Sequence, residues 1–439
     1  MPGWALTRIC RIVHMKLGKS QPTIADVRMR GFPSRARVAT ALDWIERNVR
    51  ALDPEAVALD ELHGRVLASD VTAGLDVPAF DRAAMDGYAL RGAETIGAAE
   101  YNPLVFELRG AALPGHPYDA AVLPGTAIRI MTGAPMPDGA DAVVMVEYTE
   151  RDGDAVRVLR AARPGDHVRA AGGDVAAGDL VFPAGTALGP AHLGVLTSSS
   201  FEDVEVVPRA RVGVLSTGDE LVERGPLRPG QIRDSNRPML LGQVVDAGAD
   251  AADLGLAPDD ESIITRTLED ALASCDAVLT SGGVSVGDFD YVKSALGRLG
   301  RMQSWQVAIK PAKPLAFGVI DRTPVFGLPG NPVSSLVSFE LFARPALLLM
   351  MGHAARFRPE VTATAERAMP RKPDGKLHLD RVRVRAEGDS WFAARTGEQA
   401  SNVLSATATA NGLTLLPDGD GVAEGGAVRV MRLDWPADH

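Results

Sequence analysis

The chain has 439 residues, of which 46% are hydrophobic, and it carries a formal net charge of −10. Single hydrophobic cores rarely grow beyond about 250 to 300 residues, so we expect about three or four domains. The negative charge would repel a phosphate backbone, which argues against general nucleic-acid binding. An anionic ligand must therefore be held by a local cationic cluster.

Apolar runs and cysteines exclude two further classes of protein. The most apolar stretch, residues 336–351, is interrupted by charged residues and a proline, so no run reaches the roughly 18 residues of a membrane-spanning helix. Only Cys10 and Cys275 are present, which leaves no disulfide framework and no paired-cysteine metal site. We expect a protein outside the membrane, in the reducing cytoplasm.

Residues 1–35 form a basic leader. Through residue 37 the only acidic residue is Asp26, against eight lysines and arginines. The segment lacks the long apolar core and cleavage site of a secretory signal, although an acid-poor, Arg-rich start superficially suits an organelle transit peptide. Because Met15 and Met29 are alternative starts, we favour a disordered or over-extended beginning of the chain.

The elements after the leader change character twice. Apolar residues recur with helical spacing over residues 35–48, and a proline ends the pattern, which predicts a first helix. Over residues 56–201 short apolar runs such as 127–131 and 142–146 alternate with Gly and Pro, which is typical of β-rich structure. After residue 208, strands at 211–215 and 277–280 flank a helix at 238–248 and indicate an α/β unit with a parallel sheet.

The remaining elements complete this unit and begin another. Residues 314–320 and 324–328 read as strands, and residues 332–351 as a helix with proline in its first turn. From residue 361 onward, alternating stretches such as 377–384 and 428–433 are joined by Gly-rich turns, which predicts a small closed β domain.

Polar loops follow the predicted strands of the α/β unit. Ser216 to Glu220 follows the first strand, and ligands of open α/β sheets bind at such carboxyl ends. Thr280 to Asp290 follows the next strand and is rich in glycine and hydroxyls, so it can wrap backbone N–H groups around a phosphate. Acids beside a phosphate suit Mg²⁺, but Asp288 and Asp290 equally suit a helix N-terminus. Asp234-Ser235-Asn236 reads most simply as a helix cap.

Two further loops carry candidate chemistry. Lys310-Pro311-Ala312-Lys313-Pro314 holds two lysines on a stiffened segment, which suits a tetrahedral oxyanion, or else an edge strand protected by Lys and Pro. Gly327 to Ser334 follows a strand and opens the longest helix, so its backbone donors and Asn331 would face the same sheet edge. Earlier in the chain, the acidic stretch Asp76 to Ala89 and the segment Arg129 to Pro135 have no obvious structural explanation.

Together these segments resemble the molybdenum-insertion enzymes of molybdenum cofactor biosynthesis, the family of the gephyrin E domain. The resemblance spans about residues 36–435. Its markers are Asp76 to Ala89, Thr132, Gly173-Asp174, Ser216 to Glu220, Ser281 to Asp290, Lys310 to Pro314 and Gly327 to Pro332.

The resemblance implies a multidomain α/β plus β fold. It assigns residues 36–50 and 201–358 to an α/β pterin-binding domain, 54–73 and 178–200 to a small linking β module, 74–177 to an acidic β-rich module, and 359–439 to a C-terminal β-barrel. It also implies a homodimer in which Asp86 and Thr132 act across the subunit interface. A transient contact with the adenylyltransferase of the preceding step would follow.

The resemblance also implies roles for individual residues. Lys310, Lys313, Arg381 and Ser401 match the cluster around the molybdate oxyanion, and Asp259 and Asp290 match the acids linked to Mg²⁺. Catalysis would involve Asp86, Asp259, Asp290, Lys310 and Lys313. The adenylylated pterin would be lined by Thr132, Asp174, Ser216, Asp219, Glu220, Gly282, Gly283, Ser285, Pro329, Asn331 and Pro332.

This sequence departs from the family pattern in two places. Ala312 replaces the glycine of the usual Pro-Gly-Lys-Pro, and if that position needs a positive φ, alanine strains the lysine loop. Residues 377–380 lack the aromatic side chain that commonly precedes the arginine at position 381.

The implied activity is a Mg²⁺-dependent insertion of molybdate into an adenylylated pterin dithiolene with release of AMP. Three alternatives stay open: a molybdopterin adenylyltransferase, which the extra β modules disfavour; a non-catalytic dimeric scaffold of the gephyrin type; and a nucleotide pyrophosphatase. The eight histidines form no HExxH motif, and no Ser-His-Asp arrangement is required.

Overall fold

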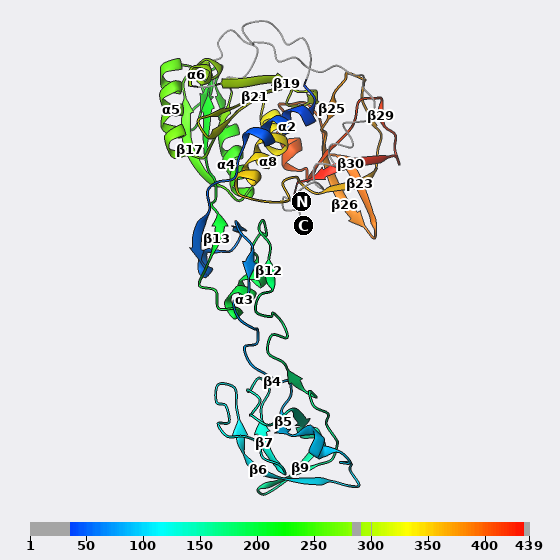
Figure 1. Cartoon of the computed structure of the whole chain (residues 1–439). Coiled ribbons are helices and arrows are strands. Elements are labelled where there is room, and N and C mark those ends of the chain that lie inside the picture. Colours follow the sequence, from blue (N-terminus) through cyan, green and yellow to red (C-terminus); the bar gives the residue numbers. More distant parts are fainter. Residues whose placement is uncertain (1–35, 283–290, 300, 434–439) are drawn as a thin grey trace. The chain divides into compact units, whose positions relative to one another are not determined.

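A computed structural model describes residues 36–282, 291–299 and 301–433 of the chain (Figure 1). The chain divides into two compact units. One comprises residues up to 55, 64–66 and from 207 onward, and the other comprises residues 56–63 and 67–206. The basic leader lies outside the described residues.

The first unit contains a six-stranded sheet in the order β17-β14-β18-β22-β21-β19. Its parallel part is β17 (Asp250–Ala257), β14 (Arg211–Thr217), β18 (Ala277–Ser281) and β22 (Thr323–Leu328). Helices α5 (Glu261–Ser274) and α6 (Tyr291–Leu299) cover one face, and α2 (Val38–Asn48) and α4 (Asn236–Asp246) cover the other (Figure 1). The predicted α/β unit is confirmed.

The sheet is mixed, which corrects the expectation of a parallel sheet. Strand β21 (Pro314–Ile320) runs antiparallel to β22, and β19 (Arg301–Gln306) runs antiparallel to β21. Only Asp321 and Arg322 separate β21 from β22. A two-residue connection reverses the chain, because a parallel pair needs a crossover of a dozen or more residues.

The predicted helix over residues 332–351 is present but interrupted. It consists of α7 (Pro332–Ser338), a π-helical turn (Phe339–Ala343) and α8 (Arg344–Met350). Pro345 has no N–H for a helical bond, which accounts for a disturbed ladder just before it. The segment Pro332–Met350 is long and apolar enough to cross a membrane, yet 83% of its most apolar window is buried, as in a core helix of a soluble protein.

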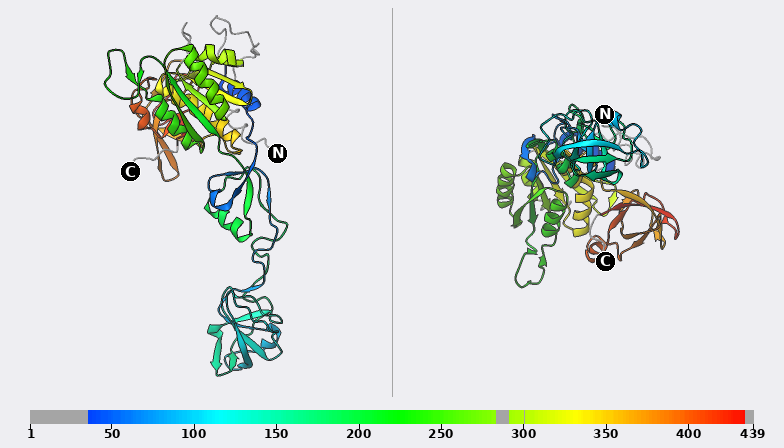
Figure 2. Two further views of the ribbon diagram at one scale, coloured as in Figure 1. Left: turned by 90° about the vertical axis from the view of Figure 1, so that its left-hand side faces the viewer. Right: turned by 90° about the horizontal axis from the view of Figure 1, so that it is seen from below.

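A closed five-stranded barrel ends the described chain. Its order is β23-β27-β26-β28-β30, with bounds Glu360–Ala365, Ser390–Arg395, Arg381–Glu387, Gly412–Thr414 and Ala427–Arg432 (orange to red in Figure 2). Alternate residues such as Val382, Val384 and Val430 fill its core. The predicted closed β domain is confirmed.

The second unit is mainly β structure. A six-stranded sheet has the order β8-β5-β7-β6-β10-β9, with bounds Ala142–Met145, Gly87–Leu90, Thr126–Ile130, Leu104–Ala112, Ala155–Val158 and Thr149–Asp152. The unit also contains helix α3 (Pro190–Ser198) and two strand pairs, β11-β4 (Val168–Arg169 and Arg82–Ala83) and β12-β3 (Leu180–Phe182 and Val71–Thr72). It holds most of the three-stranded sheet β1-β13-β2 (Glu55–Ala58, Asp203–Val207 and Val66–Leu67). The short strands predicted at 127–131 and 142–146 are confirmed.

Candidate functional site

The candidate site begins where the order of the parallel strands reverses. From β14 the chain crosses to β17 on one side, then returns past β14 to β18 on the other. Ligands of open α/β sheets bind at the carboxyl ends of the strands at such a reversal. Residues 218–220 follow β14 and Gly282 follows β18, so the described parts of both predicted loops begin at this edge.

Strand β21 brings the lysine loop to the same edge. Because β21 is antiparallel to β22, with Ala316 opposite Gly327, its first residue lies at the end where β22 finishes. Lys313 immediately precedes β21, and the Pro329-Gly330-Asn331 loop immediately follows β22. A parallel β21 would have placed Lys313 at the opposite end of the sheet.

Ser216 belongs to a polar cluster beneath the first loop. Its buried hydroxyl donates to Asp234 Oδ1 (3.0 Å), and Asp234 also accepts from the backbone N–H of Arg237 (3.1 Å) in the first turn of α4. Arg237 forms ion pairs with Asp234, Asp253 and Glu223. Asp234 therefore provides the predicted cap at 234–236, and the hydrogen bond from Ser216 helps to hold the Asp234 carboxylate in place.

The second and third loops touch each other. Gly282 has φ +96°, its N–H donates to the Leu328 carbonyl (3.2 Å), and a Cβ on it would meet the Thr217 carbonyl at 2.8 Å. Only glycine fits there, because the strand ends approach too closely for a side chain. A Cβ on Gly330 would lie 3.9 Å from the Cα of Gly282. The convergence of three loops is thus observed.

Asn236 joins these loops and was missed as a functional candidate. Its side-chain Nδ2 donates to Ser281 Oγ and to the Gly330 carbonyl, both at 2.7 Å. The sequence places Asn236 two residues after Asp234, where helix capping explains it without a ligand. Only the pairing of β14, β18 and β22 brings the two distant loops to its amide.

Three carboxylates gather after β14 and β17. The Asp259 N–H donates to Asp219 Oδ1 (3.0 Å), and the Glu220 carboxylate lies over Gly218, where a Cβ would meet it at 2.6 Å. Burial, together with the negative charges of Asp219 and Glu220, raises the pKa of the Asp259 carboxyl. A cation bound among these oxygens would relieve that repulsion.

The lysine loop, residues 310–314, has a positive φ at Ala312, the position at which the family usually has glycine. Ala312 is buried with φ +73°, the left-handed region in which glycine is free of strain, while Lys310 and Lys313 are exposed. Strand β20 (Ile309–Lys310) pairs with β25 (Leu377–His378) beside the barrel, and the Lys310 carbonyl accepts from the N–H of Leu379 (2.8 Å). The condition under which alanine strains this loop, a positive φ at position 312, is therefore met.

Arg381 lies inside the barrel domain rather than on its surface. Its guanidinium is fully buried and donates to the carbonyls of Glu398, Gln399 and Ala400 at 2.9 to 3.1 Å. Burial lowers the pKa of this guanidinium, while Asp380 opposes the shift. The next residue, Ser401, accepts through its carbonyl from the N–H of Val333 (3.2 Å) at the start of α7. In this conformation Arg381 holds the loop that reaches the α/β domain.

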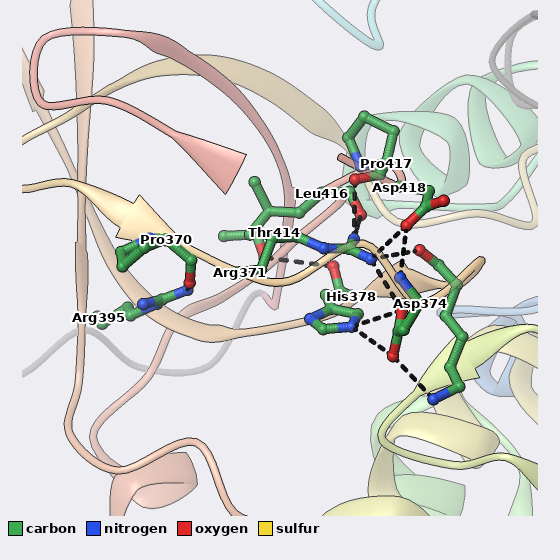
Figure 3. A network of polar contacts seen from close by, with 10 residues as sticks. Pro370, Arg371, Asp374, His378, Arg395, Thr414, Leu416, Pro417 and Asp418 are labelled. Carbon is green, nitrogen blue, oxygen red and sulfur yellow. Dashed lines mark hydrogen bonds and ion pairs between the residues drawn. The ribbon is translucent and has the colours of Figure 1, made fainter. Parts of the chain in front are cut away.

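A second polar network supports β25 next to Lys310 (Figure 3). Asp374 accepts from Arg371 (2.9 Å), from Lys376 (2.8 Å) and from Nε2 of His378 (3.2 Å). Burial alone would raise the pKa of Asp374, but the hydrogen bonds from Lys376 and His378 lower it well below its usual range. Burial lowers the pKa of His378, Asp374 opposes this shift, and the positive charges of Arg371 and Lys310 add to it.

The acidic stretch of the second unit has a structural role. Asp76, Asp81 and Asp86 each accept a backbone N–H from a loop far along the chain, at 2.7 to 2.8 Å; the donors are Ala177, Ala171 and Thr132. The Thr132 hydroxyl also donates to Asp86 (2.8 Å), and these two bonds lower the pKa of the exposed Asp86 carboxyl. The structure thus brings Asp86 and Thr132 together. Asp174 belongs to the same β-rich unit and is exposed.

The remaining predicted residues divide into two groups. Pro329 and Asn331 lie in the loop between β22 and α7, where Asn331 is exposed, and Pro332 is the first residue of α7. Gly283, Ser285 and Asp290 lie outside the described residues. Within the described part of the chain, no group of three or more His, Cys, Asp or Glu side chains is arranged to hold a metal ion.

Comparisons with known proteins agree with this architecture. Residues 36–200 match the MoeA N-terminal region (domain I and II), residues 213–348 a probable molybdopterin binding domain, and residues 362–433 the MoeA C-terminal region (domain IV). The family expected from the sequence is confirmed.

Similar proteins cover most of the chain. Molybdopterin molybdenumtransferase 2 of Mycobacterium tuberculosis is 40% identical over 377 residues, 84% of this chain and 92% of that protein. The molybdopterin molybdenumtransferase of Bacillus subtilis is 34% identical over 88% of this chain and 92% of its own length. The crystal structure of a molybdopterin biosynthesis MoeA protein from Pyrococcus horikoshii has a TM-score of 0.80 at 30% identity and covers 92% of this chain and 100% of that one. The chain therefore belongs to the MoeA family, whose bacterial relatives are named molybdopterin molybdenumtransferases.

Proposed function

We propose that this chain is a molybdopterin molybdenumtransferase, which inserts molybdate into adenylylated molybdopterin and releases AMP. The observation that carries the proposal is the reversed strand β21, which puts Lys313 at the same sheet edge as the loops after β14, β18 and β22. One edge then offers backbone donors for a pyrophosphate and cations for an oxyanion.

Different residues bind the two substrates. The loops around Ser216, Gly282 and Asn331 bind the adenylylated pterin, and Lys310 and Lys313 hold molybdate near the dithiolene sulfurs. The sulfurs replace oxygen ligands of molybdenum, and the pyrophosphate link to AMP is hydrolysed. Holding both reactants at one edge makes the ligand exchange effectively intramolecular.

The loop of residues 398–401 links Arg381 and Ser401 to this site. Because the Arg381 guanidinium binds the carbonyls of residues 398–400, it fixes the loop whose next residue, Ser401, contacts the start of α7. We assign Arg381 the positioning of that loop and Ser401 a place beside the oxyanion.

Magnesium suits the acidic side of the edge. Asp259 lies with Asp219 and Glu220, and burial together with the negative charges of these neighbours raises its pKa. Carboxylate oxygens are the donors that a hard divalent cation prefers. The described residues by themselves do not complete a group of three metal-binding side chains, so a further ligand is needed. Asp259 would hold Mg²⁺ together with these neighbours and Asp290, which lies outside the described residues. The ion would offset the negative charge of the pyrophosphate.

We further propose a homodimer that is cytoplasmic and meets the adenylyltransferase transiently. In it the Asp86 and Thr132 pair of one subunit would complete the site of the other. Support comes from the exposure of both side chains and of nearby Phe80 and Met85, which are 48% and 42% exposed. Exposed apolar residues beside a preorganised carboxylate suit a surface that a second copy covers.

One incubation tests the reaction. Purified protein is given adenylylated molybdopterin and Mg²⁺, with and without molybdate, and both AMP release and reconstitution of a molybdenum-free oxidoreductase are measured. We expect both signals to require molybdate. AMP release that is indifferent to molybdate would instead support the nucleotide pyrophosphatase, and formation of adenylylated pterin from ATP would support the adenylyltransferase.

A further inference from the structure

Asn236 occupies an unusual place at the candidate site. It is the first residue of α4, only 8% exposed, and its amide reaches partners 45 and 94 residues away in the sequence. Ser281 is the last residue of β18, and Gly330 belongs to the loop after β22. A single side chain therefore forms hydrogen bonds both to the end of β18 and to the loop after β22.

The orientation of this amide follows from its partners. The Gly330 carbonyl can only accept a hydrogen bond, so the atom 2.7 Å from it must be the nitrogen of Asn236. The same nitrogen lies 2.7 Å from Ser281 Oγ. Both hydrogens of the amide are thereby used, and Oδ1 is left buried without a hydrogen-bond partner among the described residues.

The orientation decides what Ser281 can do. Toward Asn236 the Ser281 oxygen acts as an acceptor, so its own hydrogen stays available for another oxygen. Among the described residues, no other hydrogen bond of this hydroxyl occurs, and Gly282 follows it at the sheet edge. A hydroxyl that already accepts one hydrogen bond is a better donor for a second, because bonds in a chain polarise one another.

We propose that Asn236 is a positioning residue for the pterin substrate, and that Ser281 is the hydroxyl it orients toward a phosphate oxygen of the adenylylated pyrophosphate. The inference rests on the proposed function, because it names how that substrate is gripped. Asn236 fixes the spacing of the second and third loops through Gly330 and sets the direction of the Ser281 hydrogen.

A simple capping role predicts a different response to substitution. At a helix N-terminus an aspartate serves as well as an asparagine and also suits the helix dipole. At the bridge an aspartate would set an oxygen against the Gly330 carbonyl and lose both donated bonds. Asn236→Asp therefore separates the two roles, and Asn236→Ala removes the bonds without adding the repulsion.

The experiment measures equilibrium binding of adenylylated molybdopterin, by quenching of protein fluorescence, alongside KM, kcat and the melting temperature. We expect Asn236→Ala to weaken binding about 10-fold and Asn236→Asp about 10- to 100-fold, from one or two lost hydrogen bonds. KM should rise while kcat at saturation changes little, because the lost interaction is uniform binding. Ser281→Ala should weaken binding like Asn236→Ala, and the double variant should be no weaker than either alone.

Gln243→Leu is the matched control. Gln243 is buried two turns farther along α4, and its amide donates to Glu340 (3.0 Å) away from the loops. We expect it to lower the melting temperature while binding the pterin as the unmodified protein does. Asn236→Asp binding as tightly as the unmodified protein, or Gln243→Leu binding as weakly as Asn236→Ala, overturns the positioning role. An unmodified protein that binds no adenylylated pterin overturns the proposed function itself.

Discussion

Replacing Ala312 by glycine tests whether the lysine loop is strained. Ala312 has φ +73° and is 2% exposed, between the two lysines assigned to molybdate. A side chain in the left-handed region costs roughly 1 to 2 kcal/mol relative to glycine. The substitution Ala312→Gly removes that cost.

Two losses of stability oppose this relief of strain. Losing a buried methyl group costs about 0.8 kcal/mol. The greater freedom of glycine in the unfolded chain costs about 0.5 to 1 kcal/mol more. Since relief of strain offsets both, we expect Ala312→Gly to change the free energy of unfolding by less than about 1 kcal/mol in either direction.

A second alanine supplies the reference. Ala316 is 4% exposed in strand β21 of the same sheet and has no positive φ. Ala316→Gly should lower the free energy of unfolding by about 1.3 to 1.8 kcal/mol, because nothing offsets the lost methyl and the added freedom. Urea unfolding of both variants gives the difference, which we expect to be about 1 to 2 kcal/mol. Equal destabilisation by the two substitutions would refute the strain at Ala312.

Four further outcomes follow from the site. Lys313→Gln should weaken the apparent affinity for molybdate by about 1 to 3 kcal/mol with a melting temperature that barely moves, because the side chain is exposed; a normal molybdate dependence would remove Lys313 from the site. Thr132→Val should raise the pKa of Asp86 in a carboxyl NMR titration, because one of the bonds that lower it is lost. Since the folded pKa is depressed, the contribution of Asp86 to stability is present above its unfolded pKa and is lost as the pH falls through the folded pKa; an unmoved pKa would contradict this. Arg381→Met should lower the free energy of unfolding by about 2 to 4 kcal/mol, because three carbonyls lose a charged donor; lost molybdate affinity at full stability would show that the guanidinium serves the oxyanion instead. Mixing inactive Asp86→Ala and Lys313→Ala subunits should recover part of the activity if the site spans two subunits, and no recovery would place both residues in separate roles.

Several features of the site were predictable because their signals are local. Glycines and hydroxyls after residues 215 and 280 mark loops that must bend sharply, and Gly282 shows why, since a Cβ there would meet the Thr217 carbonyl. The replacement of the family's glycine by Ala312 marked a position that would be strained at a positive φ, and the structure has φ +73° there. The proline at position 332 predicted the start of α7.

Other features could not be predicted because they depend on partners distant in the sequence. The acidic stretch that holds Asp76, Asp81 and Asp86 had no obvious structural explanation in the sequence, but each of these acids accepts an N–H from a loop 46 to 101 residues away. Arg381 matched an oxyanion ligand, yet its donors reach the carbonyls of residues 398–400. Which donor meets which acceptor is decided by packing and not by residue type.

The sequence by itself determined the periodicity of the elements, the polar character of the strand ends and the family of the chain, because each of these is written in neighbouring residues or in ordered motifs. Only the tertiary structure decided the direction of β21, and with it the edge at which Lys313 lies. Hydrophobic alternation is the same for a parallel and an antiparallel strand. The two-residue connection to β22 and the pairing of Ala316 with Gly327 fix the direction, and so bring Lys313 to the edge where β14, β18 and β22 end.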